Sequence, residues 1–233
     1  MNYQNIYILG GHKLSYSYYE KITQASDDGT LSFAHCQLID ADPDCYASDL
    51  VTHDSLIQKT NSEFILDYLK NDQNPQDILI PDHTAKHVML QVYLDLAKKE
   101  FPDLNTAPAA IPLSLNTPFM HPSDDKSILA VSYATWTCPA DCAEPAICPH
   151  TESERSWDFN KTFAEIADEI KSNKTALYRF ACEPFLAEIC HLPFKDIFSQ
   201  TQSFIKSVKA STIQKVIVAT HSHCHGILGS FSI

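Results

Sequence analysis

The cysteines of this sequence are its clearest indication of chemistry. Cys138, Cys142 and Cys148 lie within eleven positions, in the segment CPADCAEPAICP. The prolines of this segment prevent a regular helix or a central strand, so the cysteines are expected in an irregular loop. Bound metal stabilises thiolate charge, and a proline-stiffened backbone loses less entropy when several sulfur atoms converge on one centre. The spacing therefore predicts a metal or cluster site.

A fourth ligand is expected from the segment HSHCHG near the end of the sequence. Cys224 follows a strand predicted at residues 215–220, and if this strand is parallel to one predicted at 128–133, their carboxyl ends share one edge of a sheet. Strand alternation would turn Cys224 and His225 to opposite faces, but Gly226 is expected to end the strand early. We predict Cys224 as the fourth ligand and His225 as a nitrogen donor or proton-transfer group, although strand-end histidines are more often simply exposed.

The spacing leaves the identity of the metal open between an iron–sulfur cluster and zinc. Structural zinc sites pair their cysteines two to four residues apart, which the first cysteine pair fits and the second exceeds. The softness of thiolates favours iron–sulfur, although neither standard ferredoxin spacing is present. Asp141, Glu144 and His150 are candidates for hydrogen bonding to the ligands. The alternative is that these thiols pack as small hydrophobic side chains or form a redox pair, as Cys36 is expected to pack inside a strand.

The first half of the sequence contains a weaker signal for a nucleotide. Gly10 and Gly11 follow a strand predicted at residues 5–9, and Asp40 follows a strand predicted at 31–39. This arrangement is typical of a site where phosphate approaches a helix start and a carboxylate binds a ribose, which predicts a dinucleotide cofactor. The third glycine of the fingerprint is missing, so a Rossmann-like scaffold without a ligand is the alternative.

The order of predicted elements indicates the fold class. Strands and helices alternate, which favours a Rossmann-like, mostly parallel α/β sheet, followed by a second α/β half that carries the cysteine-rich metal loop. A proline-rich stretch at 101–122 suggests halves at 1–122 and 123–233, or one continuous domain. The expected strands are at 5–9, 31–39, 77–80, 128–133, 176–182 and 215–220, and the expected helices at 16–22, 63–70, 89–96, 159–171 and 197–208.

Composition excludes several classes of partner. The chain has 233 residues, with 17 Lys and Arg against 29 Asp and Glu and a net charge of −12, and no basic cluster that would attract nucleic acid. No apolar run reaches the length of a membrane span, and the N-terminus lacks the pattern of a signal peptide. We therefore expect a cytoplasmic protein with reduced thiols, no membrane association, and a small molecule or nucleotide as its partner. The oligomeric state stays open.

The cysteine segment and the later THSHCHG together resemble an uncharacterised group of bacterial proteins that is loosely labelled potassium-transporter-like. In that group the first half is similar to the nucleotide-binding domain of potassium-uptake regulators, and the second carries CPxxCxEPxxCP and a late CHG. The resemblance points to the four cysteines named above, and to Glu144, Pro145, Thr151, His225 and Gly226. Where the group has a further cysteine two positions before CHG, this chain has Ser222.

These observations predict a soluble metal- or iron–sulfur-binding protein with a redox or metal-dependent function. This function could be coupled to a nucleotide or small molecule bound at the strand edge. The resemblance supplies no reaction, and transport does not fit a chain without membrane spans. The competing interpretation is a non-enzymatic protein in which zinc only fastens the loop to the sheet. A catalytic zinc site keeps an open coordination position, whereas a structural one is closed.

Overall fold

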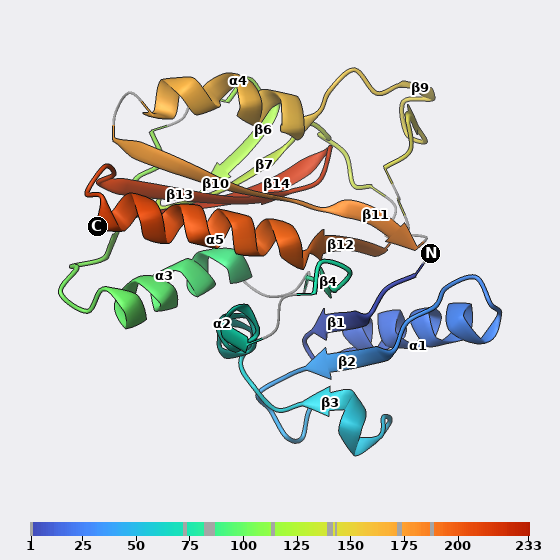
Figure 1. Cartoon of the computed structure of the whole chain (residues 1–233). Helices are drawn as coiled ribbons and strands as arrows, with labels where there is room; N and C mark the ends of the chain where they lie inside the picture. Colours follow the sequence, from blue (N-terminus) through green and yellow to red (C-terminus); the bar gives the residue numbers. More distant parts are fainter. Residues whose placement is uncertain are drawn as a thin grey trace. The chain divides into compact units, whose positions relative to one another are not determined.

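The computed structural model describes residues 2–71, 74–81, 87–112, 115–138, 142, 144–171, 174–186 and 189–233. Two compact parts form in this chain (Figure 1). Unit 1 comprises Met1–Val88 and Pro184–Ser199, and unit 2 comprises Met89–Glu183 and Gln200–Ile233. The proline-rich stretch at 101–122 lies within unit 2.

Unit 1 is built on a six-stranded sheet in which four neighbouring strands are parallel and one further strand, β12, pairs antiparallel to β4. Helices α1 (Lys13–Asp27) and α2 (Asn61–Asn71) and the short 3-10 helix η1 (His53–Ser55) join the parallel strands. The order β3-β2-β1-β4 confirms the predicted Rossmann-like arrangement. The strands in sheet order are β11 (Glu183–Leu186), β12 (Ile189–Pro193), β4 (Ile78–Ile80), β1 (Asn5–Leu9), β2 (His35–Ile39) and β3 (Leu56–Ile57).

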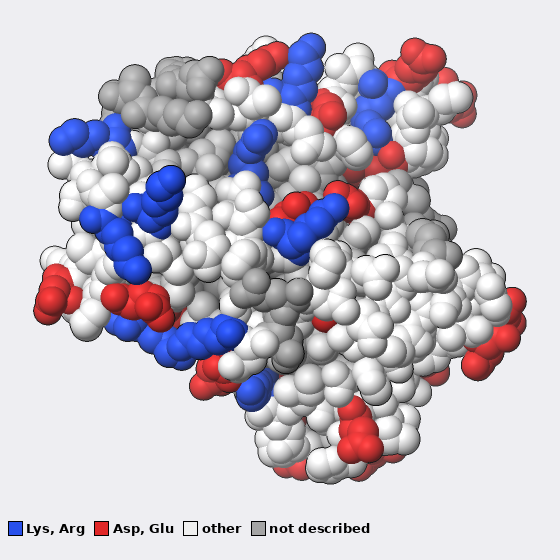
Figure 2. All heavy atoms as spheres, in the orientation of Figure 1, with Lys and Arg blue, Asp and Glu red and all other residues white. Residues whose placement is uncertain are grey.

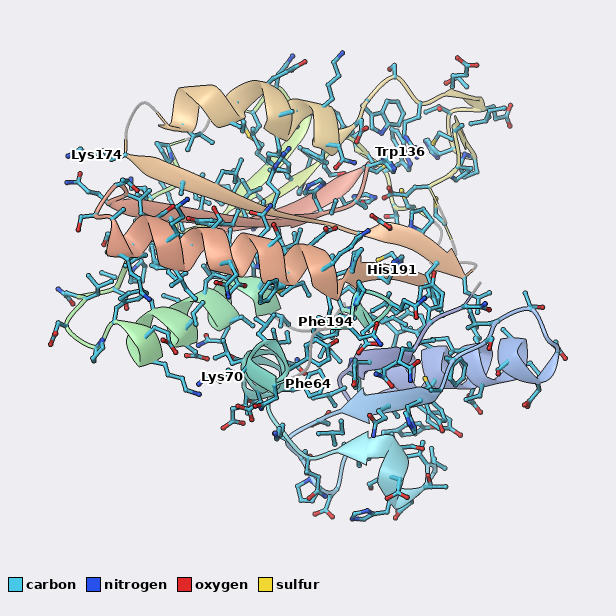
Figure 3. All side chains as sticks on the ribbon, viewed as in Figure 1. Phe64, Lys70, Trp136, Lys174, His191 and Phe194 are labelled. Atoms are coloured by element: carbon cyan, nitrogen blue, oxygen red, sulfur yellow. The ribbon has the colours of Figure 1, made fainter. Side chains whose placement is uncertain are left out.

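The centre of this sheet is apolar: all three residues of β4 are buried, and the carboxyl-terminal halves of β1 and β2 are buried leucine and isoleucine. Ile6, Ile8 and Cys36 belong to one buried cluster, as predicted for Cys36. Burial raises the pKa of the Cys36 thiol to about 12, so this thiol stays protonated. Around Tyr7, the rings of Phe64, Tyr68 and Phe194 pack together, and Figure 3 labels Phe64 and Phe194.

Unit 2 contains a mixed sheet. Strands β10 and β13 are parallel, whereas β14 is antiparallel to both of its neighbours, β13 and β7. The short strand β5 (Ala107–Pro108) pairs with β14, and a separate hairpin is formed by β8 (Ile147–Cys148) and β9 (Ser153–Glu154). The strands in sheet order are β10 (Thr175–Ala181), β13 (Lys215–His221), β14 (His225–Ser232), β7 (Ile128–Ser132) and β6 (Phe119–Pro122).

Helices cover both faces of the mixed sheet (Figure 1). Helix α4 (Phe159–Lys171) packs on one face, where Phe159 and Phe163 join a buried cluster with side chains of β7, β13 and β14. Helices α3 (Val88–Glu100) and α5 (Phe194–Lys209) lie on the other face in Figure 1. There Tyr93 packs against Tyr178, Phe180 and Phe204. This two-sided packing holds the strand ends that carry the predicted ligands.

The strand directions bring three chain segments to one edge of this sheet. Since β7 and β13 are both antiparallel to β14, they run in the same direction, and their carboxyl ends meet the start of β14. His225 pairs with Ser132, and His221 pairs with Gly226. The predicted shared edge therefore exists, with β14 inserted between the two strands.

The surface carries both signs of charge. In Figure 2 the visible face of unit 2 shows Lys and Arg side chains among Asp and Glu, and the visible face of unit 1 shows mainly acidic side chains. Across the described part of the chain, no helix combines the length and the apolar character that crossing a membrane requires.

Candidate metal centre

The residues predicted as metal ligands line one cavity of unit 2, with a volume of about 130 Å³. Cys138, Cys142, Cys148, Cys224 and His225 all contribute to its wall. The structure thus brings together residues that are up to 87 positions apart in the sequence. The rest of the wall is formed by Ala134, Trp136, Glu144, Pro145, Pro149, Arg155 and Trp157.

The turn between β13 and β14 presents Cys224 and His225 to the cavity. Strand β13 ends at His221, so the alternation that would separate the two side chains does not continue to them. The expectation that Gly226 ends the strand was wrong, because Gly226 lies inside β14, which begins at His225 and pairs back onto His221. The N–H of Tyr133 donates to the carbonyl oxygen of Cys224 at 3.0 Å, which fixes the turn to the end of β7. His225 contacts the hydroxyl of Ser132 through Nδ1 at 3.0 Å and the sulfur of Cys138 through Nε2 at 3.5 Å.

Glu144 fastens the cysteine segment to this turn. Its carboxylate accepts hydrogen bonds from the Ser222 hydroxyl at 2.6 Å and from the N–H groups of His223 and Cys224 at 2.8 and 3.3 Å. Both carboxylate oxygens are therefore engaged by the turn. Ser222, at the position where the related group was expected to carry a further cysteine, serves here as a donor to Glu144.

The hairpin β8–β9 closes the other side of the cysteine segment. Cys148 is its second residue, and its carbonyl oxygen accepts from the N–H of Glu152 at 2.8 Å. The Arg155 guanidinium donates to the carbonyl oxygens of Glu144 and Pro145. These bonds hold an otherwise irregular loop, and they place one positive charge in the wall of a cavity that contains four thiols.

Both tryptophans of the chain also line the cavity. The indole N–H of Trp157 donates to the sulfur of Cys224 at 3.2 Å. Trp136, labelled in Figure 3, lies near the start of β14 and stacks on His150 with ring centres 4.4 Å apart. Asp141, the other acidic candidate beside the cysteines, lies outside the described residues.

The thiols differ in their tendency to ionise. Burial raises the pKa of Cys138, as do the neighbouring thiols of Cys142 and Cys148. Burial also raises the pKa of Cys224 to about 11. By contrast, backbone N–H groups of Thr151 and His150 and the charge of Arg155 lower the pKa of Cys148. A metal that bound here would release protons from Cys138 and Cys224 at neutral pH, which links metal affinity to pH.

The other two histidines of the segment have different surroundings. His223 Nδ1 lies 2.9 Å from the carboxylate of Asp158. Burial works to raise the pKa of Asp158, but hydrogen bonds from Asn160 and His223 lower it overall. His221 is buried beside Phe163, and burial lowers its pKa, so the ring is neutral at neutral pH. Neither ring lines the cavity.

The cavity is not yet a coordination shell. Within the described ranges, which leave out residues 139–141 and 143, no three His, Cys, Asp or Glu side chains converge closely enough to hold a metal ion. The ligand candidates share a space, and binding would require the cysteine side chains to turn toward one centre.

The residues of the predicted nucleotide site also lie together, at the carboxyl edge of the parallel sheet in unit 1. Gly10 follows the last residue of β1 and has a positive φ of 85°. Gly11 donates its N–H to the Asp40 carboxylate at 2.6 Å, and the N–H of Asp42 donates to the same carboxylate at 2.9 Å. A side chain at Gly11 would overlap Cys45. A phosphate at Gly11 would therefore have to displace Asp40.

Comparison with known sequences places the chain in a family. A family model, AF_1314_C, described as "Uncharacterized protein, C-terminal domain", matches residues 80–233. This match covers more than half of the chain, so the chain belongs to that family, and the cavity lies entirely within the matched residues. The likeness of the first half to potassium-uptake regulators stays a prediction. Searches of curated proteins and of solved structures found no match.

Proposed function

We propose that this protein binds an iron–sulfur cluster through Cys138, Cys142, Cys148 and Cys224 and has a redox function. The observation that carries the proposal is that one cavity is lined by all four of these thiols. In a reducing compartment disulfides are rare, so four thiols around one cavity favour a shared metal ligand over separate burial of each thiol.

The size of the cavity favours a cluster over a single ion. A cavity needs roughly 10–15 Å³ to hold one water molecule, and this cavity measures about 130 Å³. A zinc ion lies inside the contact distance of its ligands and needs little additional space. The volume among the thiols therefore suits a group of several atoms.

The charges of the wall agree with such a ligand. Four thiolates carry more negative charge than the iron–sulfide core of a cluster neutralises, and the Arg155 guanidinium lies in the same wall. Glu144, the acidic residue of the wall, directs its carboxylate to the Ser222–Cys224 turn. This arrangement keeps a further negative charge from acting as a ligand and leaves that role to sulfur.

The test is purification under anaerobic conditions, followed by visible absorption and by iron and sulfide analysis. We expect a brown protein with stoichiometric iron and sulfide. Cys138→Ala and Cys148→Ala should each lose the metal and destabilise unit 2, because metal binding is linked to folding. Cys36→Ala, in the buried core of unit 1, is the matched control and should keep the metal. Equal metal content in all three variants would refute the ligand set.

A structural zinc site is the second candidate, and the contact of 3.5 Å between His225 Nε2 and Cys138 Sγ favours it. Three thiolates and one imidazole form a common zinc ligand set. The two proposals predict opposite effects of two substitutions on metal content. For a four-thiolate cluster, Cys224→Ser should lose the metal and His225→Ala should keep it, with His223→Ala having little effect. If His225→Ala loses the metal while Cys224→Ser keeps it, the site is a zinc site with one imidazole.

A further inference from the structure

The tryptophans occupy places that hydrophobic packing alone does not explain. The chain has two tryptophans, and both line the cavity of the four thiols. Each has an indole N–H, which is a donor and cannot accept a hydrogen bond. Trp157 directs this group to Cys224 Sγ at 3.2 Å. One of the four proposed ligand atoms therefore already has a hydrogen-bond donor.

Trp136 places the same group near Cys138. Its Nε1 is buried and makes no hydrogen bond of full geometry among the described residues. Burial raises the pKa of the Cys138 thiol, and the interaction of this thiol with Trp136 works to lower it by a smaller amount. A buried donor that lacks a partner costs free energy, and most such groups in native proteins have one. Because Trp136 belongs to the cavity wall, an acceptor bound in the cavity would satisfy this N–H.

Neighbouring rings hold both indoles in place. Trp136 stacks on His150 with an angle of 11° between the ring planes, and Trp157 stacks on Tyr133 with centres 6.3 Å apart. The two indoles contact each other edge to face, with centres 6.2 Å apart. The directions of the N–H groups are therefore fixed by packing, and donating to a bound group requires little further ordering.

We infer that Trp136 and Trp157 donate hydrogen bonds to sulfur atoms of the bound centre and thereby raise its reduction potential. This inference rests on the proposed iron–sulfur centre. Hydrogen bonds to cluster sulfurs are among the factors that set the potential, because they stabilise the extra negative charge of the reduced state. Trp157 acts on the thiolate of Cys224, and Trp136 acts on a sulfur that the centre brings within reach.

The experiment compares the midpoint potential of the wild type with those of Trp157→Phe and Trp136→Phe. Phenylalanine keeps an apolar ring and removes the donor. Tyr133→Phe is the matched control, because its hydroxyl bonds to Thr162 rather than to a sulfur. We expect iron content to be unchanged in all three variants. For each tryptophan variant, the equilibrium constant of reduction should fall about tenfold, or ~59 mV for a one-electron couple, whereas Tyr133→Phe should match the wild type.

The outcomes separate this inference from the proposed function. Full iron content with unchanged potentials in both tryptophan variants would overturn the inference and leave the cluster standing. Loss of iron in both variants would mean that the indoles only hold the cavity together, which also overturns it. A wild-type protein without iron or zinc would refute the proposed function, and the inference with it.

A zinc-containing protein needs a different measurement, since zinc has no redox couple. Where zinc is held by Cys224 as a thiolate, the readout is the rate at which iodoacetamide modifies Cys224 in the metal-loaded protein. Loss of the N–H donor makes the sulfur more nucleophilic, so Trp157→Phe should react severalfold faster than the wild type and Tyr133→Phe. Equal rates would overturn the role of Trp157.

Discussion

At the scale of single residues, Glu144 holds the two ligand-bearing segments together. Its carboxylate accepts three hydrogen bonds from the turn that presents Cys224. In Glu144→Gln the side chain loses its charge, and its single acceptor oxygen can serve either the two backbone N–H groups or the Ser222 hydroxyl, but not both. We expect a loss of about 1–2 kcal/mol in the free energy of unfolding, because hydrogen bonds to charged groups are the stronger ones. Urea unfolding of the metal-free protein measures this loss.

A control for Glu144→Gln is Glu154→Gln, which removes a carboxylate of the same kind from an exposed position on β9. This variant should unfold within about 0.5 kcal/mol of the wild type. A Glu144→Gln protein that matched the control would show that the three hydrogen bonds do not hold the loop.

The spacing of the cysteines predicts which thiols share a cavity, because proline restricts the loop and the strand ends fix the rest. What sequence cannot supply is the surroundings of those thiols. Trp157 reaches Cys224 across 67 positions, and Glu144 reaches Ser222 across 78. Such contacts follow from tertiary packing and leave no periodic signal. Its position beside the cysteines marks Glu144 as a candidate hydrogen-bonding residue, but the sequence does not show that its partners are Ser222 and the backbone of the turn.

At the scale of elements, the helix predicted at 159–171 has those bounds, and the strand predicted at 128–133 ends at Ser132. Strand β14 was not predicted, because Gly226 and Gly229 lower the strand propensity of its sequence. Those glycines have a packing reason. An added side chain at Gly226 would press on His221 and Val131. In β14, glycine therefore lowers the strand propensity but allows close contact with the neighbouring strands.

Gly229 tests this account. A side chain here would overlap the Leu90 methyl groups of α3, so the Leu90 side chain would have to move to admit it. We expect Gly229→Ala to destabilise unit 2 by about 1–3 kcal/mol, as other overpacking substitutions do. The double variant Gly229→Ala with Leu90→Ala should be more stable than the sum of the two single effects predicts. Thermal unfolding of the four proteins gives the coupling, and additive effects would contradict the packing argument.

At the scale of the whole molecule, the chain leaves unit 1, builds most of unit 2 and returns for residues 184–199. This return depends on β12 pairing with β4, more than a hundred positions away in the sequence. A local pattern such as the prolines at 101–122 cannot predict the pairing of strands so far apart in the sequence. The α/β class can be predicted, because the alternation of strands and helices is a local property.

The cavity lies within unit 2, so removing the metal should act on that unit. After treatment with a chelator, amide hydrogens at 144–158 and 221–226 should exchange faster, because metal no longer links the two segments. Amides of β1, β2 and β4 should exchange at unchanged rates. Hydrogen exchange with mass spectrometry follows both regions in one sample. Faster exchange throughout unit 1 would mean that the two units do not unfold independently.

The parallel sheet of unit 1 raises the remaining question of a dinucleotide. Its strand order is that of nucleotide-binding folds, and Gly10, Gly11 and Asp40 lie together at the carboxyl edge.

A bound phosphate would compete with Asp40 for the Gly11 N–H, so we expect weak binding of adenine dinucleotides. A ligand at ten times its dissociation constant stabilises the native state by about 1.4 kcal/mol, which raises the melting temperature by about 3–6 °C for a protein of this size. Asp40→Ala should lower the melting temperature without ligand, since it removes two hydrogen bonds, and should increase the ligand-dependent rise, since the Gly11 N–H is then free to bind phosphate. The increment with ligand, not the absolute value, therefore carries the test. No increment at millimolar concentration would leave unit 1 as a scaffold whose own carboxylate fills the phosphate position.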